Sequence, residues 1–126
     1  MIEGFTPSRV DTGDVSISVH RAGKGTPLIL LHGYPQNHHC WASVAPTLAQ
    51  HFDVIIPDLR GYGDSDAPPD DADHSTYSTR RMAADIIGLL DALALDRAHV
   101  LGHDRGARVT YRLALDHPDR ILPLGL

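Results

Sequence analysis

One short stretch constrains the fold of this chain more than any other. Residues 98–101 form a short, largely apolar run that leads directly into a glycine-flanked turn, 102–106, and a helical pattern follows. A strand that turns straight into a helix crowds its own backbone, so the residues flanking the turn must be small. The central residue, Asp104, is then pushed outward at the carboxyl end of the strand. The stretch therefore predicts a strand–turn–helix unit with an exposed carboxylate at its apex.

Asp104 has the chemistry of a candidate nucleophile. A carboxylate attacks carbon without needing a base to deprotonate it first. The helix that begins at the turn directs its positive N-terminal end toward this side chain, which favours the charged form. The alternative is an ordinary solvent-exposed turn aspartate. The flanking glycines, the strand and the helix together favour the nucleophile.

The rest of the chain alternates between strand and helix patterns. The expected strands cover 15–19, 28–31, 54–56, 98–101 and 121–126. The expected helices cover 41–49, 82–93 and 106–116. Continuous apolar runs are typical of strands buried on both faces, whereas apolar residues at helical spacing indicate one packed helix face. Strands alternating with helices predict an α/β fold, with a mainly parallel sheet and flanking helices, in a single domain of residues 1–126.

Two glycine loops follow strands of this sheet, one after Leu31 and one after Leu101. Ligands of parallel sheets bind at the carboxyl ends of the strands. We therefore expect Asp104 and the backbone of Gly33 and Tyr34 to lie on the same side of the molecule.

Composition narrows the classes of partner. The formal net charge of −5, from 11 basic and 16 acidic residues, argues against a nucleic-acid surface. No apolar run approaches the roughly 20 residues of a membrane span, and the N-terminus lacks the features of a signal peptide. The single cysteine, Cys40, excludes an internal disulfide, so a reducing cytoplasm is the expected setting. No cofactor is expected.

Four motifs in order resemble the α/β-hydrolase superfamily and, more narrowly, the fluoroacetate (haloacetate) dehalogenases. The resemblance covers nearly the whole chain. The motifs are HGYPQN at 32–37, PDLRGYGDSD at 57–66, GHDRGAR at 102–108 and LALDHP at 113–118. The narrower assignment depends mainly on Asp104 and Arg105, together with Arg108.

The resemblance implies a role for each site residue. Asp104 would displace halide from the α-carbon of a haloacetate and form an ester intermediate. Arg105 and Arg108 would hold the carboxylate of this small anionic substrate, and a guanidinium fork matches a carboxylate with two parallel hydrogen bonds. The backbone N–H groups of Tyr34 and Arg105 would form the anion-stabilising pocket.

The chain departs from this family in length. Members are roughly twice as long, and their second half supplies further strands, a helical cap, the halide-binding groups and a catalytic histidine that activates water. The sequence is therefore expected to form the N-terminal half of the fold without the cap domain. Hydrolysis of the ester then has no assigned base. A self-associated homodimer, whose second copy replaces the missing half, is the favoured expectation over an unstable truncated product.

Several functions stay open at this point. The leading hypothesis is a hydrolase of the haloacetate-dehalogenase lineage. The alternatives are weak promiscuous ester hydrolysis at the same pocket and a catalytically inactive structural or interaction module. Epoxide hydrolysis also uses an aspartate in this turn, but Arg105 argues against it, because the resemblance implies an apolar aromatic residue there in that subgroup.

Other polar residues have structural interpretations. His32 and His103 flank the two loops and are expected to act as hydrogen-bonding groups rather than proton carriers. Asp58 is expected to accept hydrogen bonds from nearby loop groups. No metal site is expected at 38–40, because adjacent residues on a helix point about 100° apart. The acidic stretch 64–73 lacks the pattern of a calcium loop.

Overall fold

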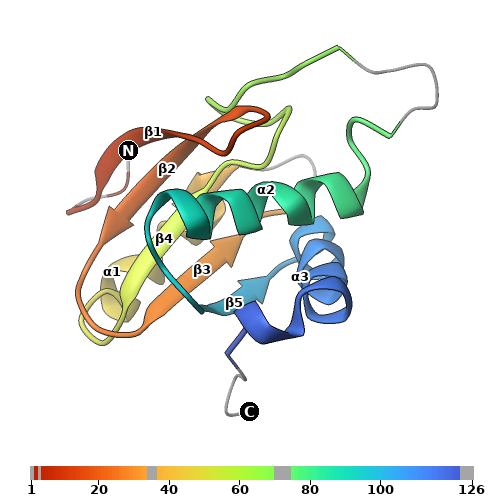
Figure 1. Cartoon of the computed structure of the whole chain (residues 1–126). Coiled ribbons are helices and arrows are strands. Elements are labelled where there is room, and N and C mark those ends of the chain that lie inside the picture. Colours follow the sequence, from red (N-terminus) through yellow and green to blue (C-terminus); the bar gives the residue numbers. More distant parts are fainter. Residues whose placement is uncertain (1, 3, 34–36, 70–74, 123–126) are drawn as a thin grey trace.

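The computed structural model describes residues 2, 4–33, 37–69 and 75–122, which form one five-stranded sheet with helices on both faces (Figure 1). The strands are β1 (Thr6–Asp11), β2 (Ser16–Ala22), β3 (Pro27–Leu31), β4 (Asp53–Pro57) and β5 (His99–Gly102). The α-helices are α1 (Ala45–Leu48), α2 (Thr79–Ala92) and α3 (Arg105–Asp116). Two short 3₁₀ helices, η1 (His38–Trp41) and η2 (Pro118–Arg120), complete the set. The expected α/β class is confirmed.

The sheet is mixed rather than mainly parallel. Its strand order is β1-β2-β4-β3-β5, and the two parallel pairs are those that β3 forms with β4 and with β5. β2 runs antiparallel to both β1 and β4. The sequence analysis missed β1 because its residues, TPSRVD, are largely polar and exposed. β1 and β2 form a hairpin, which needs only a short turn between its strands. No helix pattern therefore separates the two strands in the sequence, and the alternation of strands and helices does not predict β1.

Two of the expected helices differ from the observed ones, the first by being divided and the second by starting earlier. The predicted helix over 41–49 is two short pieces, η1 and α1, because Pro46 lacks the N–H that would continue the helical bonds across them. The predicted helix over 82–93 begins earlier, at Thr79. Its first turn is capped by Ser78, whose side chain accepts a hydrogen bond from the backbone N–H of Arg81.

Two apolar clusters lie on the two faces of the sheet. Alternate residues of β3 point to opposite faces: Ile29 and Leu31 pack under α2 and α3, whereas Leu28 and Leu30 pack toward α1. Figure 1 shows α2 crossing one face of the sheet, with α1 behind it on the other. The central strands are therefore covered on both faces, as their continuous apolar sequence predicted.

A further parallel strand starts beside β5. Ala98 forms a parallel bridge with Ile121, and the backbone N–H of Leu122 donates to the carbonyl oxygen of Ala98 at 2.9 Å. The rest of the predicted strand over 121–126, including Pro123, lies outside the described residues. No helix within the described part of the chain is long and apolar enough to cross a membrane.

Candidate active site

The turn between β5 and α3 has the geometry that its sequence predicted. Asp104 is the N-cap residue of α3 and has φ 56° and ψ −115°, a conformation that residues other than glycine rarely adopt. Backbone bonds on both sides hold it there. His103 donates to the carbonyl oxygen of Leu31 at 3.0 Å, and Ala107 donates to that of Asp104 at 3.0 Å. Strain of this kind costs on the order of 1–3 kcal/mol and persists only where the surrounding structure imposes it.

Close backbone packing explains the glycines near Asp104. A Cβ on Gly106 would lie 2.2 Å from the carbonyl oxygen of Leu31, so α3 could not approach β3 as closely. A Cβ on Gly33 would lie 2.5 Å from the Cβ of Asp104 and 2.9 Å from its Oδ2. The expected proximity of the two glycine loops is therefore confirmed at Gly33. Tyr34, the next residue in that loop, lies outside the described residues.

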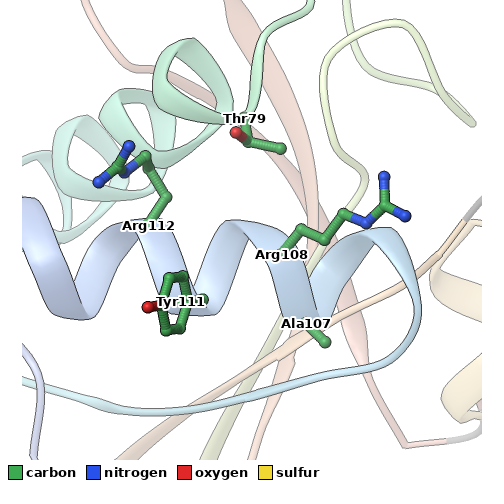
Figure 2. A pocket seen from close by; sticks show the side chains of 5 residues that line it. All are labelled: Thr79, Ala107, Arg108, Tyr111 and Arg112. Carbon is green, nitrogen blue, oxygen red and sulfur yellow. The ribbon is translucent and has the colours of Figure 1, made fainter.

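The two candidate carboxylate-binding arginines line different hollows. Arg105 is half-buried, and its Nε is buried without a hydrogen-bond partner among the described residues. It lines a hollow of about 400 Å³ together with Gly61, Tyr62, Ala67, Tyr77 and Met82. Arg108 is exposed and lines a hollow of about 470 Å³ between the start of α2 and α3 (Figure 2). The residues of that second hollow are Thr79, Ala107, Arg108, Tyr111 and Arg112.

A third hollow, of about 240 Å³, adjoins the residue before the candidate nucleophile. His103 lines it together with Cys40, Trp41, Ser43 and Val44. Trp41 also packs against the apolar cluster on the α1 face. The hollow is lined by residues at the end of η1 and between η1 and α1. A continuous helix over 41–49 did not predict it.

His32 is a structural hydrogen-bonding group, as predicted. Its Nε2 accepts a hydrogen bond from the backbone N–H of Leu59 at 3.0 Å, so Nδ1 carries the proton and faces the carbonyl oxygen of Gly33 at 3.0 Å. Burial lowers the pKa of the His32 imidazole, because the charged form loses its hydration. The neutral ring thereby links the loop after β3 to the loop after β4.

Asp58 has the acceptor role that the sequence predicted. Its carboxylate is fully buried and accepts hydrogen bonds from the backbone N–H of His38 at 2.7 Å, from Nδ1 of His38 at 2.8 Å and from the backbone N–H of Asp64 at 3.1 Å. The His38 ring also stacks on His20 at 3.8 Å between centroids. No group of three metal-ligating side chains occurs within the described ranges. Asp70, Asp71 and Asp73 lie outside them.

Sequence reasoning missed the buried guanidinium of Arg60. Its Nε and Nη2 donate to the two oxygens of Asp85 on α2, both at 2.6 Å. Nη2 also donates to Asp14, and Nη1 to the carbonyl oxygen of Thr76 at 3.1 Å. These carboxylates raise the pKa of Arg60, and the hydrogen bond from Arg60 lowers the pKa of Asp14. The network ties α2 to the loop that carries Gly61, a wall of the Arg105 hollow.

Comparison with known proteins agrees with this architecture. The family described as the alpha/beta hydrolase fold matches residues 26–124. The chain is 51% identical, over all 126 residues, to a fluoroacetate dehalogenase from Burkholderia sp, of which it covers 41%. It is 45% identical over 100 residues to a soluble epoxide hydrolase from Corynebacterium sp. (strain C12), with 79% of this chain and 33% of that protein covered.

A solved structure supports the same conclusion. An epoxide hydrolase from Vigna radiata superposes with a TM-score of 0.88 at 30% identity, over 96% of this chain and 37% of that one. The chain thus spans about two fifths of the length of these relatives. Because the family match covers most of the sequence and the strained turn at Asp104 accompanies the matching sheet, this chain belongs to the α/β-hydrolase fold family.

Proposed function

We propose that this chain carries the nucleophilic half-reaction of a haloacetate-dehalogenase-type hydrolase, with Asp104 as the nucleophile. The supporting observation is the position of Asp104 at the apex of a strained strand-to-helix turn, packed against Gly33. A turn of this kind fixes a reacting group relative to the neighbouring loop, and such positioning lowers the barrier to attack.

In the proposed step, one carboxylate oxygen of Asp104 bonds to the α-carbon of a haloacetate as the carbon–halogen bond breaks. The halide leaves with the bonding electron pair, and a carboxymethyl ester of Asp104 remains. Water then hydrolyses that ester to glycolate and regenerates the carboxylate. The first step needs no base, because a carboxylate is already a nucleophile.

An anionic substrate requires positive charge near an anionic nucleophile. Arg105 follows Asp104 directly, and its buried Nε has no partner among the described residues, so it is available to a carboxylate. Leaving a buried charged donor unpaired is costly, and an acid group placed in its hollow would remove that cost. Arg108, one turn along α3, offers a second guanidinium from the neighbouring hollow.

Epoxide hydrolysis is the second candidate, because relatives of both kinds match the chain. The same carboxylate would open an epoxide and form an ester of the resulting diol. A neutral epoxide gives Arg105 no carboxylate partner, and for that reason we favour the haloacetate. The two substrates are distinguished by comparing chloroacetate with a neutral epoxide such as styrene oxide at equal concentration.

The test is a halide-release time course with excess chloroacetate and a known molar amount of the chain. The proposal predicts at least one equivalent of chloride per chain, with none from Asp104→Asn. Asp119→Asn, a change of an aspartate on η2, serves as the matched control and should release chloride like the unaltered chain. Undiminished release by Asp104→Asn, or no release by the unaltered chain, would overturn the proposal.

A further inference from the structure

Three histidine rings are in contact in a row on the α1 face of the sheet. His20 is on β2, where it pairs with Ile56 of the α1-face cluster, and His38 and His39 begin η1. The ring centroids of His20 and His38 lie 3.8 Å apart with an angle of 20° between the planes, and those of His38 and His39 lie 4.1 Å apart. His20 and His38 are buried, whereas His39 is exposed. We name these three side chains the histidine stack.

His38 connects the stack to the turn at Asp104. Its ring Nδ1 and its backbone N–H both donate to Oδ1 of the buried Asp58, at 2.8 and 2.7 Å, and so fix the start of η1. Two residues later, the sulfur of Cys40 forms a hydrogen bond with the backbone of Gly33. Gly33 packs directly on Asp104, because a Cβ at this glycine would lie 2.5 Å from the Cβ of Asp104. The hold of Asp58 on His38 therefore reaches the candidate nucleophile through η1 and Gly33.

The ring of His20 has no acceptor for a second proton. It is 5% exposed, and its Nδ1 is buried without a hydrogen-bond partner among the described residues. In the neutral ring this nitrogen can remain an unprotonated acceptor, but protonation turns both ring nitrogens into donors. A buried charged donor without an acceptor is costly. The observed arrangement is therefore stable only while His20 is neutral.

The charges around the stack point to Asp58 as the group for which a protonated His20 would compete. Burial and the neighbouring His38 ring lower the pKa of His20, and the carboxylate of Asp58 opposes that shift. The other charged or titratable groups that act on members of the stack are His32, Asp64 and the amino terminus. Because Asp58 already accepts two hydrogen bonds from His38, a second cationic donor can reach it only by displacing that residue.

We propose that the histidine stack is a pH-dependent positioning device for the turn at Asp104, with His38 as the positioning residue and His20 as the group that displaces it. While His20 is neutral, His38 holds η1 on Asp58. When His20 takes up a proton, it turns toward Asp58 and η1 loses its hydrogen bonds to that carboxylate. The contact between Cys40 and Gly33 then loosens, and Asp104 loses the support of the neighbouring loop.

This device acts as feedback on the proposed reaction, a consequence that rests on the proposed function. When a haloacetate anion is hydrolysed, the carbon–halogen bond breaks and a carbon–oxygen bond to water forms. The products are glycolate, a halide ion and one proton, which passes to the solvent. Accumulating product therefore acidifies the solution, and acid slows the reaction by releasing His38.

The first readout is the fluorescence of Trp41, the one tryptophan of the chain, which ends η1. Its emission should shift to longer wavelength between pH 7.5 and 5.5, because a displaced η1 brings the indole into water, while the far-ultraviolet circular dichroism stays constant. His20→Phe keeps a flat ring without a titrating nitrogen and should abolish most of the shift. His117→Phe, at the end of α3, is the matched control and should retain it.

The second readout is the thiol of Cys40, the one cysteine of the chain. At pH 7.5 its reaction with dithiodipyridine should be about tenfold faster in His38→Leu than in the unaltered chain, because thiol access follows local opening. His38→Asn should restore the slow reaction, since its side-chain N–H can donate to Asp58 from a position close to that of the lost Nδ1. Rescue by asparagine distinguishes positioning by a hydrogen bond from simple loss of packing.

Three results would overturn the proposal. One is Trp41 emission that is constant over this pH interval or shifts equally in His20→Phe. Another is a Cys40 thiol that reacts in His38→Leu as slowly as in the unaltered chain. The third is a shift that coincides with loss of circular dichroism, which would assign it to global unfolding. Neither readout requires turnover, so chloride release without these changes refutes only this inference, and these changes without chloride release refute only the proposed function.

Discussion

Asp104 differs from an ordinary surface aspartate in its backbone as well as in its surroundings. Its positive φ is held by hydrogen bonds from His103 and Ala107 and by close packing at Gly33 and Gly106. Those contacts fix the Cα–Cβ direction of Asp104 relative to the loop after β3. The strain is thus a property of the surrounding backbone, and changes in the glycines should alter the carboxylate's position without changing its chemistry.

Gly106→Ala tests this packing. Its new methyl group would meet the carbonyl oxygens of Leu31 at 2.2 Å and His32 at 2.7 Å, which are backbone atoms and cannot turn aside. We expect the free energy of unfolding to fall by about 1–3 kcal/mol, as for other overpacked sites. Ala107→Ser, on the exposed side of the same turn, should change it by less than about 0.5 kcal/mol. Urea denaturation measures both, and equal midpoints would contradict the packing account.

Arg105 should control the binding of small acids. Glycolate at millimolar concentration should raise the melting temperature of the chain, because it offers a carboxylate to the Nε of Arg105, which has no hydrogen-bond partner in the described part of the chain. Arg105→Met should abolish most of that increase. Arg97→Met, at an exposed arginine between α2 and β5, should retain it. A glycolate effect that survives in Arg105→Met would remove Arg105 from the substrate site.

At the scale of elements, the loop after β4 connects the sheet to α2 through buried charges. Arg60 is 1% exposed and bonds at once to α2, to the β1–β2 turn and to the backbone before α2. His32, in the loop after β3, accepts a hydrogen bond from the backbone N–H of Leu59 in this loop, and Asp58 accepts one from Asp64 within it. The walls of the Arg105 hollow, Gly61 and Tyr62 among them, are therefore positioned by hydrogen bonds that converge on one loop.

Asp85→Asn tests this connection. It leaves the Arg60 charge buried with one compensating carboxylate fewer, and breaking such a pair costs about 3–5 kcal/mol. The matched control on the same helix is Asp91→Asn, which removes an exposed pair with Arg120 and should cost no more than about 1 kcal/mol. Thermal unfolding distinguishes the two variants. A similar loss of stability in the two variants would mean that the buried Arg60–Asp85 pair contributes no more to the free energy of unfolding than the exposed pair.

At the scale of the whole molecule, two buried histidines should make stability depend on pH. Burial lowers the pKa of both His20 and His32 below the ordinary value of 6.5, so the folded chain resists their protonation. The unfolded chain takes up these protons first as the pH falls below about 6.5. The contribution of these two histidines to the free energy of unfolding should therefore be constant above pH 7 and decline between about pH 6.5 and the lowered values.

Urea denaturation at pH 7.5 and 5.5 measures this decline. His32→Asn keeps a polar side chain without a titrating ring, and its stability should fall less steeply over that interval. A higher free energy of unfolding for the unaltered chain at pH 5.5 than at pH 7.5 would contradict the predicted direction of this pH dependence. The lowered pKa of Asp14 does not affect stability in this interval, because its carboxylate takes up a proton only at lower pH.

The sequence predicted those parts of the molecule whose signals are local. The turn at Asp104 was readable from its glycines, and the buried strands from continuous apolar runs. β1 could not be predicted, because its residues are largely polar and its strand conformation depends on pairing with β2. The partnership of Arg60 with Asp85 was also hidden, since it joins residues 25 positions apart. The separation of Arg105 and Arg108 into different hollows likewise depends on α2 and the loop after β4.

The most direct test of the central claim locates the covalent intermediate. The chain, in a Cys40→Ser background that removes its one thiol, is treated with excess chloroacetate, quenched in acid and mapped by peptide mass spectrometry. The account predicts a carboxymethyl group on the peptide that contains Asp104, released by hydroxylamine as an ester and absent from Asp104→Asn. A label located elsewhere, or one that persists in Asp104→Asn, would show that this carboxylate is not the nucleophile.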